Sequence, residues 1–270
     1  MSAHVPIQIA AEVVAIKRVG ALRQLTLTAP GVAELFRPGN VVSLVLPGGA
    51  RLARRSYWVH RVSPVGPRGP SLELIVEPRG VAGSWLASRE PGHQVAMIGP
   101  LGRPFAQPRE PVTCVLVGDG VHAAPLVPLA ERLRERGCVV HVLLAAPTEA
   151  QLAGVVDVRR FARSVQVVTG DGSIGARGGI ADVLPELIAR TAAEVVYAAG
   201  EVPAMHDVAR IAEASGAWSQ VGLRLDQPCG TGLCHGCPVP VAGEDGAPRT
   251  VRACVEGPVF RGDRVRWADL

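Results

Sequence analysis

The sequence lacks the features that identify membrane, secreted and nucleic-acid-binding proteins. Its longest apolar runs, such as "CVVHVLLAAP" at residues 138–147, fall far short of the roughly 20 residues that a membrane-spanning helix requires. The chain does not open with a basic segment and a long apolar core, so no signal peptide is predicted. The net charge of +4, with both signs interspersed, is too small to indicate a nucleic-acid partner. These absences predict a cytoplasmic protein without a membrane span.

The familiar motifs of hydrolases and nucleotide-hydrolysing enzymes are also missing. The chain has no G-x-S-x-G nucleophile turn, no H-E-x-x-H zinc motif and no Walker phosphate loop. We therefore predict no catalytic residue of the acid–base or nucleophilic kind in this chain.

Cysteine is scarce and unevenly placed, with six residues in the whole chain. Cys114 and Cys138 lie alone in apolar segments, where buried and inert thiols are expected. The other four crowd towards the C-terminus. In a cytoplasmic protein, such a group indicates metal or cluster ligands rather than disulfides.

The spacing of these four cysteines is typical of a plant-type [2Fe–2S] cluster. It runs C-x4-C-x2-C, and a fourth cysteine follows further along the chain. Gly230, Gly232 and Gly236 let backbone N–H groups approach the sulfurs. Structural zinc is the alternative, although zinc sites favour paired C-x2-C knuckles and only one such pair is present. The predicted ligands are Cys229, Cys234, Cys237 and Cys254, and His235 between them is expected to face solvent.

Short β-branched segments separated by Gly and Pro turns fill the first hundred residues. Six of them, from "IQIAAEVVAIKRV" at residue 7 to "HQVAMIG" ending at residue 99, predict an antiparallel barrel. One short helix is expected at "AGSWLASRE", residues 82–90, with Ser84 near its start.

Strand-like and helix-like segments then alternate as far as residue 216, which predicts a parallel, doubly wound α/β sheet. From residue 223 the chain becomes rich in loops. We therefore expect three domains: a barrel over 1–108, a nucleotide-type α/β domain over 109–222, and a cluster module over 223–270.

This arrangement resembles the electron-transfer subunit of dihydroorotate dehydrogenase B, a member of the ferredoxin–NADP reductase superfamily. The motifs that carry the resemblance are "GPLGRPF" (99–105), "TGDGSIGARGGIADVL" (169–184), "CGTGLCHGC" (229–237) and "RACVEGPVF" (252–260). The resemblance implies that the barrel holds FAD and that the α/β domain receives NAD(H). It also implies that the cluster relays electrons to the FMN of a catalytic partner subunit, with a role in pyrimidine biosynthesis.

The flavin motif of that family, R-P-[IFL]-S, is matched here by "RSYW", residues 55–58. The resemblance implies that Arg55 neutralises the flavin diphosphate and that Tyr57 packs against the flavin, while Trp58 replaces a serine. The family's phosphate turn is matched loosely by "GVAGS", which puts Gly83 and Ser84 at a helix N-terminus. The alternative is a solvated strand edge at Arg54 and Arg55, with Tyr57 and Trp58 in the barrel core. The implied FAD-binding residues are Arg55, Ser56, Tyr57, Trp58, Gly83 and Ser84.

The family's nucleotide turn, G-G-G-x-G-x-A-P, appears here as "GDGVHAAP", residues 118–125. Gly118 and Gly120 match and are the implied NAD-binding residues. Asp119 and His122 introduce a carboxylate and an imidazole where a diphosphate needs close backbone approach. In the later loop "AGEVPAM", Ala199 replaces a cysteine and Glu201 adds a second carboxylate. These differences leave NAD(P)H use open and favour weak binding.

The predicted function is that of an electron-transfer subunit of a multi-subunit oxidoreductase. The substrate would be converted on a catalytic flavoprotein partner, dihydroorotate dehydrogenase-like or other, because this chain offers no base for that chemistry. Two alternatives stay open: an iron–sulfur scaffold or sensor that has lost nucleotide binding, and a zinc-stabilised interaction protein.

Overall fold

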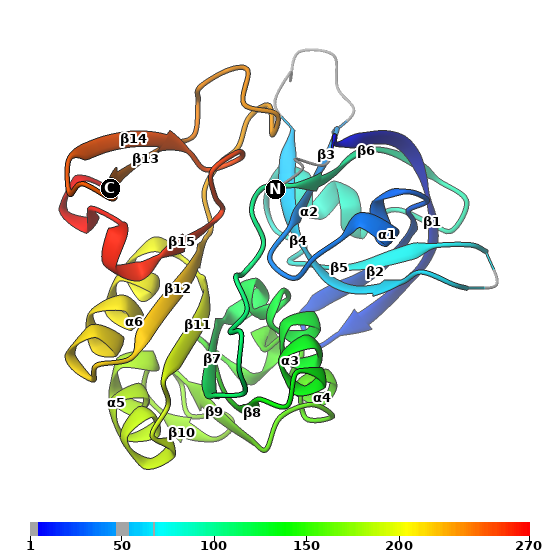
Figure 1. Ribbon diagram of the computed structural model, residues 1–270. Helices are drawn as coiled ribbons and strands as arrows, with labels where there is room; N and C mark the ends of the chain where they lie inside the picture. The colour runs from blue at the N-terminus through cyan, green and yellow to red at the C-terminus, as the bar shows by residue number, and fades with distance from the viewer. Residues whose placement is uncertain (1–4, 47–53, 67) are drawn as a thin grey trace.

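The computed structural model describes residues 5–46, 54–66 and 68–270, and it places a barrel beside an open α/β sheet (Figure 1). The sequence-based predictions for residues 1–4, 47–53 and 67 lie outside the described residues. Among the described residues, no helix combines the length and the apolar character of a membrane span.

The predicted barrel is confirmed as a closed six-stranded barrel with the order β1-β2-β5-β4-β3-β6. Its core forms because alternate side chains of each strand point inward, as Leu25 and Leu27 of β2 do. Its strands are β1 (Ile7–Val19), β2 (Leu22–Thr28), β3 (Val41–Leu44), β4 (Arg55–Ser63), β5 (Ser71–Val76) and β6 (Gln94–Leu101), with the short helix α1 (Val32–Leu35) between β2 and β3.

Helix α2 spans Gly80–Ala87 and begins two residues before the predicted start. The chain turns at Gly80 with a φ of 65°, which glycine adopts readily, so the first helical turn forms there. The expectation that Ser84 lies near the helix start is wrong, because Ser84 sits in the second turn and is exposed. Gly83 packs tightly on the chain leaving β5: a Cβ atom there would lie 2.1 Å from the Glu77 carbonyl oxygen.

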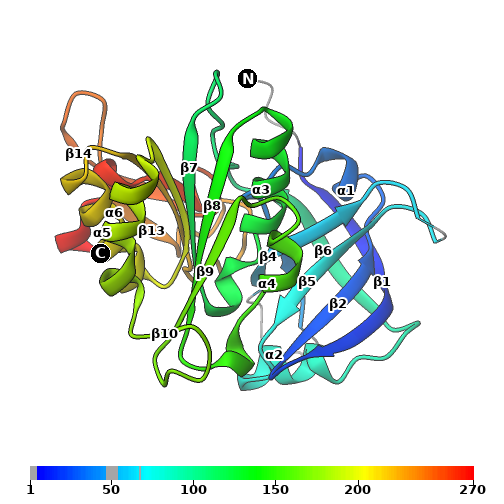
Figure 2. The same ribbon diagram turned by 90° about the horizontal axis from the view of Figure 1, so that it is seen from below.

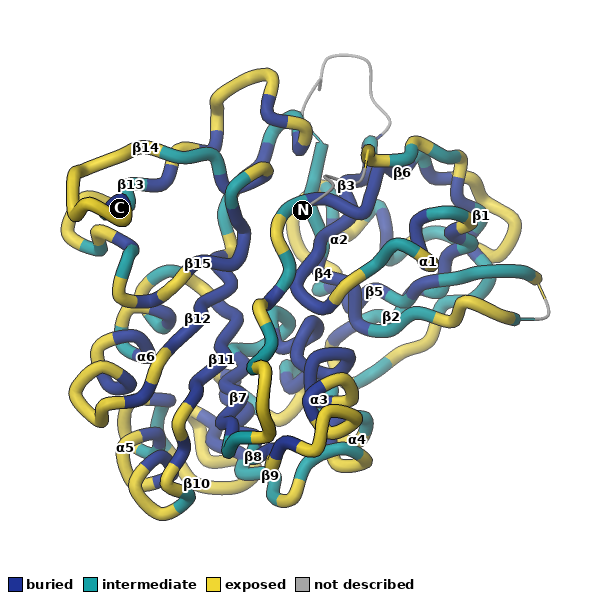
Figure 3. The backbone as a smooth tube through the Cα atoms, viewed as in Figure 1, coloured by how far each residue is buried: buried dark blue, intermediate teal, exposed yellow. Residues whose placement is uncertain are grey.

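The predicted doubly wound domain is confirmed as a seven-stranded sheet with the order β10-β9-β8-β7-β11-β12-β15. The central strands are buried on both faces, as Figure 3 shows. Helices α3 and α4 lie between the sheet and the barrel, and α5 and α6 cover the other face (Figure 2). The elements are β7 (Thr113–Asp119), α3 (Leu126–Glu135), β8 (Val139–Ala146), α4 (Val155–Val158), β9 (Ser164–Thr169), β10 (Ala176–Arg177), α5 (Ile180–Thr191), β11 (Val195–Gly200), α6 (Val202–Ala214) and β12 (Trp218–Leu223).

The C-terminal segment packs against the outer edge of this sheet. A hairpin of β13 (Pro238–Ala242) and β14 (Pro248–Arg252) precedes β15 (Val259–Arg261), which pairs antiparallel with β12. The chain therefore returns to the α/β sheet after the cysteine loop, and the cysteines lie on a segment anchored at both ends.

An ionic network joins the barrel to the α/β domain. Nε2 of the buried His60 on β4 lies 3.1 Å from Asp157 Oδ2 in α4, and Arg61 Nη2 donates to Asp157 Oδ1 at 2.5 Å. The His60 hydrogen bond holds the pKa of Asp157 below its usual range; burial opposes this shift, and the charges of His60 and Arg61 reinforce it. The carboxylate thus stays ionised at the domain junction.

We predict that Asp157→Asn lowers the free energy of unfolding by about 1–3 kcal/mol at pH 7, because a charged acceptor is lost. Since the folded-state pKa of Asp157 is depressed, its stabilisation is present above the ordinary carboxyl pKa and is lost as pH falls through the folded-state value. Urea unfolding at several pH values should therefore show wild type and variant converging in acid. Asp207→Asn, which breaks an exposed pair with Arg210, is the control and should change stability little. An equal loss for both variants would contradict the role of Asp157.

Candidate flavin cleft and cysteine cluster

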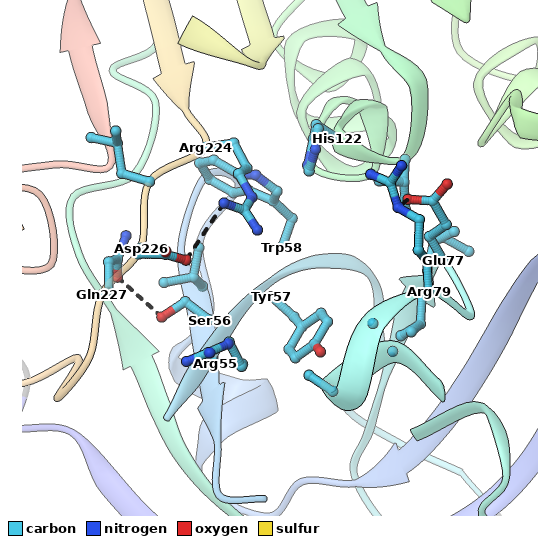
Figure 4. A pocket seen from close by; sticks show the side chains of 18 of the residues that line it. Arg55, Ser56, Tyr57, Trp58, Glu77, Arg79, His122, Arg224, Asp226 and Gln227 are labelled. Carbon is cyan, nitrogen blue, oxygen red and sulfur yellow. Dashed lines mark hydrogen bonds and ion pairs between the residues drawn. The ribbon is translucent and has the colours of Figure 1, made fainter. Parts of the chain in front are cut away.

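A cleft of about 700 Å³ opens between β4, helix α2 and the ends of the α/β strands (Figure 4). Three walls contribute side chains to it. The barrel wall comes from β3, β4 and β5, the second wall from the start of α2, and the third from the α/β domain and the segment before the cysteines. The lining residues include Arg55, Ser56, Tyr57, Trp58, Gly80, Gly83, His122, Glu201, Arg224 and Gln227.

Arg55 and Tyr57 both line the cleft from β4. Among the described residues no carboxylate pairs with Arg55, whose Nη1 donates only to the Arg54 carbonyl oxygen at 3.1 Å. Burial raises the pKa of Tyr57 to about 12 against the lowering charges of Arg55 and Arg224, so its phenol stays protonated. A half-buried cation without a carboxylate partner and a neutral aromatic ring suit an anionic aromatic cofactor such as FAD.

Trp58 is not part of the barrel core. It is only 8% exposed, and its side chain belongs to the apolar cluster shared by the barrel and the α/β domain, together with Ala199 of β11. A Cβ atom at Gly222 would lie 3.1 Å from Cη2 of the indole, so the ring packs closely on the backbone of β12. Tyr57, in contrast, packs against the barrel core. The replacement of the family serine thus fills space between the domains.

The first turn of α2 faces the cleft through residues 80–83. Unpaired backbone N–H groups of a helical first turn are suited to phosphate. Gly83 belongs to this turn, as predicted, whereas Ser84 is not among the residues lining the cleft.

The α/β wall of the cleft carries an ionic group of His122, Glu201 and Arg224. The sequence did not indicate that these three side chains lie together. His122 Nε2 lies 3.0 Å from Glu201 Oε1, and Arg224 Nε lies 3.9 Å from the same oxygen. The hydrogen bond from His122 holds the pKa of Glu201 below its usual range; burial opposes this, and the charges of His122 and Arg224 reinforce it. Glu201 is therefore an ionised but partnered carboxylate.

Asp119 and the two matching glycines lie behind this wall and do not line the cleft. Asp119 Oδ2 accepts the Glu201 backbone N–H at 3.4 Å, and burial raises the pKa of this carboxyl group. Gly118 packs against the 3-10 turn, where a Cβ atom would lie 2.4 Å from Ala123 Cβ, and Gly120 takes a φ of 55°. The glycines thus shape the turn after β7.

The four predicted cluster cysteines come together in two pairs. Cys237 and Cys254 are buried with their Sγ atoms 3.4 Å apart, and Cys229 and Cys234 lie close enough together for Cys234 to shift the pKa of the Cys229 thiol. Two thiolates on one tetrahedral metal lie roughly 3.8 Å apart when the bonds are about 2.3 Å long. Within the described residues, no three His, Cys, Asp or Glu side chains close around a single ion position. Two pairs of thiolates suit a cluster of two irons.

Backbone N–H groups approach the sulfurs as the glycine content predicts. The amides of Thr231 and Gly236 donate to Cys229 Sγ and Cys234 Sγ, each at 3.4 Å. A Cβ atom at Gly232, which has a φ of 83°, would lie 2.6 Å from Val255 Cγ2, so the loop needs glycine there. His235 is exposed, as predicted.

The pKa values of Cys229 and Cys254 are shifted in opposite directions, and the shift at Cys229 favours its thiolate form. Burial raises the pKa of Cys229, but hydrogen bonds from the backbone of Cys234 and Thr231 outweigh it and hold the value at about 6. Burial raises the pKa of Cys254 to about 12, and its contact with Cys237 adds to the shift. Since thiolates are the ligating form, a metal centre would supply the positive charge that the buried pair lacks.

Strand β4 and Arg54, the residue before it, connect the cleft to this loop through two hydrogen bonds. Ser56 Oγ donates to Gln227 Oε1 at 3.1 Å (Figure 4), and the Arg54 N–H donates to the Pro228 carbonyl oxygen at 2.8 Å. Gln227 is 4% exposed and lies two residues before Cys229. Sequence reasoning missed Gln227 and Arg224; their only signal was their position immediately before the cysteine motif.

Comparisons with known proteins find similarity to electron-transfer subunits of dihydroorotate dehydrogenase B. The sequence model described as "Iron-sulfur cluster binding domain of dihydroorotate dehydrogenase B" matches residues 228–266. The chain is 31% identical to "Dihydroorotate dehydrogenase B (NAD(+)), electron transfer subunit" of Desulforamulus reducens, over 88% of this chain and 90% of that protein. It is 35% identical to the probable equivalent of Methanopyrus kandleri, over 70% of this chain and 68% of that protein.

Solved structures agree with the fold. A chain from the structure of an NADH-dependent reduced ferredoxin–NADP oxidoreductase, studied for flavin-based electron bifurcation, superposes with a TM-score of 0.83. The two chains are 27% identical, over 97% of this chain and 91% of that one. The ferredoxin reductase of carbazole 1,9a-dioxygenase has a TM-score of 0.68 at 23% identity, over 80% of this chain and 68% of that one, and thus shares the fold.

We predict that serine at any of the four paired cysteines lowers the iron and sulfide content of anaerobically purified protein below the wild-type level of about two each. Cys114→Ser and Cys138→Ser are matched controls, because both residues are buried in the α/β core away from the loop, and they should retain the cluster. Stoichiometric zinc without labile sulfide in the wild type would contradict the assignment.

For the cleft, we predict that Arg55→Ala weakens FAD binding by about 1.5–3 kcal/mol, because a charge-assisted contact to phosphate is lost. The dissociation constant of FAD, measured by fluorescence titration of the reconstituted protein, reports the change. Arg89→Ala is the control, since Arg89 stacks on Trp85 near the C-terminal end of α2 and does not line the cleft. Equal FAD affinity in wild type and Arg55→Ala would refute the role of Arg55.

Proposed function

The chain belongs to the family of dihydroorotate dehydrogenase B electron-transfer subunits, and from this premise we propose that it relays electrons between FAD, a [2Fe–2S] cluster and a catalytic partner subunit. When bound, FAD exchanges electron pairs as hydride, and a [2Fe–2S] cluster carries single electrons. The proposed domains are a flavin barrel over 1–108, an α/β domain over 109–222 and a cluster module over 223–270.

The observation that carries this proposal is the direct connection between cleft and cysteine loop. Ser56 faces the loop, and its neighbours Arg55 and Tyr57 line the cleft, so one strand serves both proposed sites. A barrel strand paired on both sides is a rigid support, and a relay needs two centres at a fixed separation.

Within the cleft, each proposed residue has a distinct task. Arg55 neutralises the cofactor phosphates, and the first turn of α2, which Gly83 completes, adds unpaired backbone donors over residues 80–82. Tyr57 supplies a ring for packing and a protonated hydroxyl for donation. Ser56 holds Gln227 and thereby the loop, and Trp58 closes the space towards β12. None of these residues removes a proton from a substrate.

The substrate is therefore converted on the partner, which we propose is a catalytic flavoprotein subunit of the dihydroorotate dehydrogenase kind. The relatives named above are themselves electron-transfer subunits. An anaerobic visible spectrum of purified protein, followed by cofactor extraction, tests this function. Cluster and FAD together support it, and the absence of both would refute it.

The ionic group on the cleft wall opposite Tyr57 favours a second form of this proposal, in which NAD(P)H binds poorly. The wall opposite Tyr57 carries Glu201 held between His122 and Arg224. A dinucleotide entering from the α/β side meets this ionic group, and displacing it breaks a hydrogen bond and an ion pair. Electrons would then enter or leave through a protein partner.

We predict that anaerobic stopped-flow mixing with micromolar NADH or NADPH produces no rapid bleaching of flavin and cluster in the wild type. The double variant His122→Gly, Glu201→Gln removes the imidazole and the carboxylate together, while Arg224 keeps its ion pair with Asp226, and it should bind NAD+ more tightly by equilibrium dialysis. Glu201→Gln alone is the control for charge. Rapid bleaching of the wild type would show instead that it is an ordinary NAD(P)H-linked subunit.

A further inference from the structure

Ser43 of β3 is a buried polar residue in an otherwise apolar strand. Its side chain is 0% exposed, and its Oγ finds no hydrogen-bond partner among the described residues. The other residues of this four-residue strand are Val41, Val42 and Leu44, all apolar and buried. An orphaned buried hydroxyl is costly, so it calls for a ligand or a bound group as its partner.

The cysteine loop lies directly on this hydroxyl. Gly230 takes a φ of 69° there, and a Cβ atom on it would come within 3.1 Å of both Cβ and Oγ of Ser43. Gly230 sits between Cys229, a proposed ligand, and Thr231, whose N–H donates to Cys229 Sγ. The absence of a side chain at residue 230 therefore lets the loop backbone next to Cys229 pack directly on the barrel at Ser43.

The neighbouring strand explains why the loop is held in this place. Ser56 is the cross-strand partner of Ser43, and its hydroxyl is engaged by Gln227. Two serines thus face the loop from adjacent strands. The Ser56 hydroxyl is satisfied by Gln227, just before the loop, whereas the Ser43 hydroxyl has no hydrogen-bond partner among the described residues and lies next to Gly230.

We propose that Ser43 donates its hydroxyl hydrogen to a sulfur of the [2Fe–2S] cluster, either the Cys229 thiolate or a bridging sulfide, and thereby raises the reduction potential of the cluster. The inference rests on the proposed function, because it needs the cluster in the loop. A hydrogen bond to sulfur stabilises the more negative, reduced state more than the oxidised state. Ser43 is accordingly a tuning residue supplied by the flavin barrel, whereas the Thr231 and Gly236 donors belong to the loop itself.

The test is a redox titration of the holoprotein with Ser43→Ala. Iron, sulfide and FAD contents should match the wild type. At the ambient potential where half of the wild-type cluster is reduced, the ratio of reduced to oxidised cluster in the variant should fall by at least threefold; a tenfold fall corresponds to about 59 mV for one electron. Ser219→Ala is the matched control, since it removes a buried hydroxyl from β12 of the sheet, and it should leave the ratio unchanged.

Resonance Raman spectra in H2O and D2O give a second measurement. The wild type should show a deuterium shift of its Fe–S stretches that is larger than that of the variant. If Ser43→Ala does not retain the cluster, Ser43→Gly, which removes the same hydroxyl, is measured in its place. A reduced fraction and a deuterium shift equal to those of the wild type would overturn the proposal. A wild type without iron and sulfide would instead overturn the proposed function, so the two failures are distinguishable.

Discussion

The hydrogen bonds that strand β4 and Arg54, the residue before it, make to the segment before Cys229 fix the geometry on which the rest of the candidate site depends. The Arg54 N–H and the Ser56 hydroxyl hold Pro228 and Gln227, so the cysteine loop is attached to the same strand that lines the cleft. Further along, His60 of this strand joins Asp157 of the α/β domain. Strand β4 is paired on both sides in a closed barrel and is therefore rigid. The cleft, the cysteine loop and the α/β domain are all positioned by this one strand.

Most of the fold could be predicted, because the barrel strands and the central α/β strands carry strong apolar patterns. Strand β12, "WSQVGL", could not, since Ser219 and Gln220 interrupt its apolar run. Gln220 is nevertheless buried: its side-chain amide donates to the Ala106 carbonyl oxygen at 2.7 Å and its Oε1 accepts the Ala106 N–H at 2.9 Å. The partner lies 114 residues away, and local sequence carries no trace of such a contact.

Some residues of the candidate site are likewise marked by local sequence motifs, whereas others are marked only by their tertiary contacts. Cysteine spacing is a local property, so the sequence identifies the residues that the structure brings together in pairs, and Arg55 and Tyr57 likewise line the cleft. Gln227 and Arg224 matter only through tertiary contacts, and no motif marks them. The prediction that Ser84 lies near the start of α2 is wrong, because the helix begins at the backbone turn at Gly80 and not at the serine.

On the α/β side of the cleft, the number of added carboxylates alone does not describe the electrostatics that a dinucleotide would meet. Two added carboxylates suggest simple repulsion of a diphosphate, yet Glu201 is balanced by His122 and Arg224, and Asp119 turns away to accept the Glu201 N–H. Burial also raises the pKa of Asp119 above its usual range. The proposed barrier to a dinucleotide is therefore the group of His122, Glu201 and Arg224, which come from three separate segments and support one another, rather than a field of unpaired negative charge. Contacting residues of this kind have coupled energies, so the differences at positions 119, 122 and 201 act as one unit.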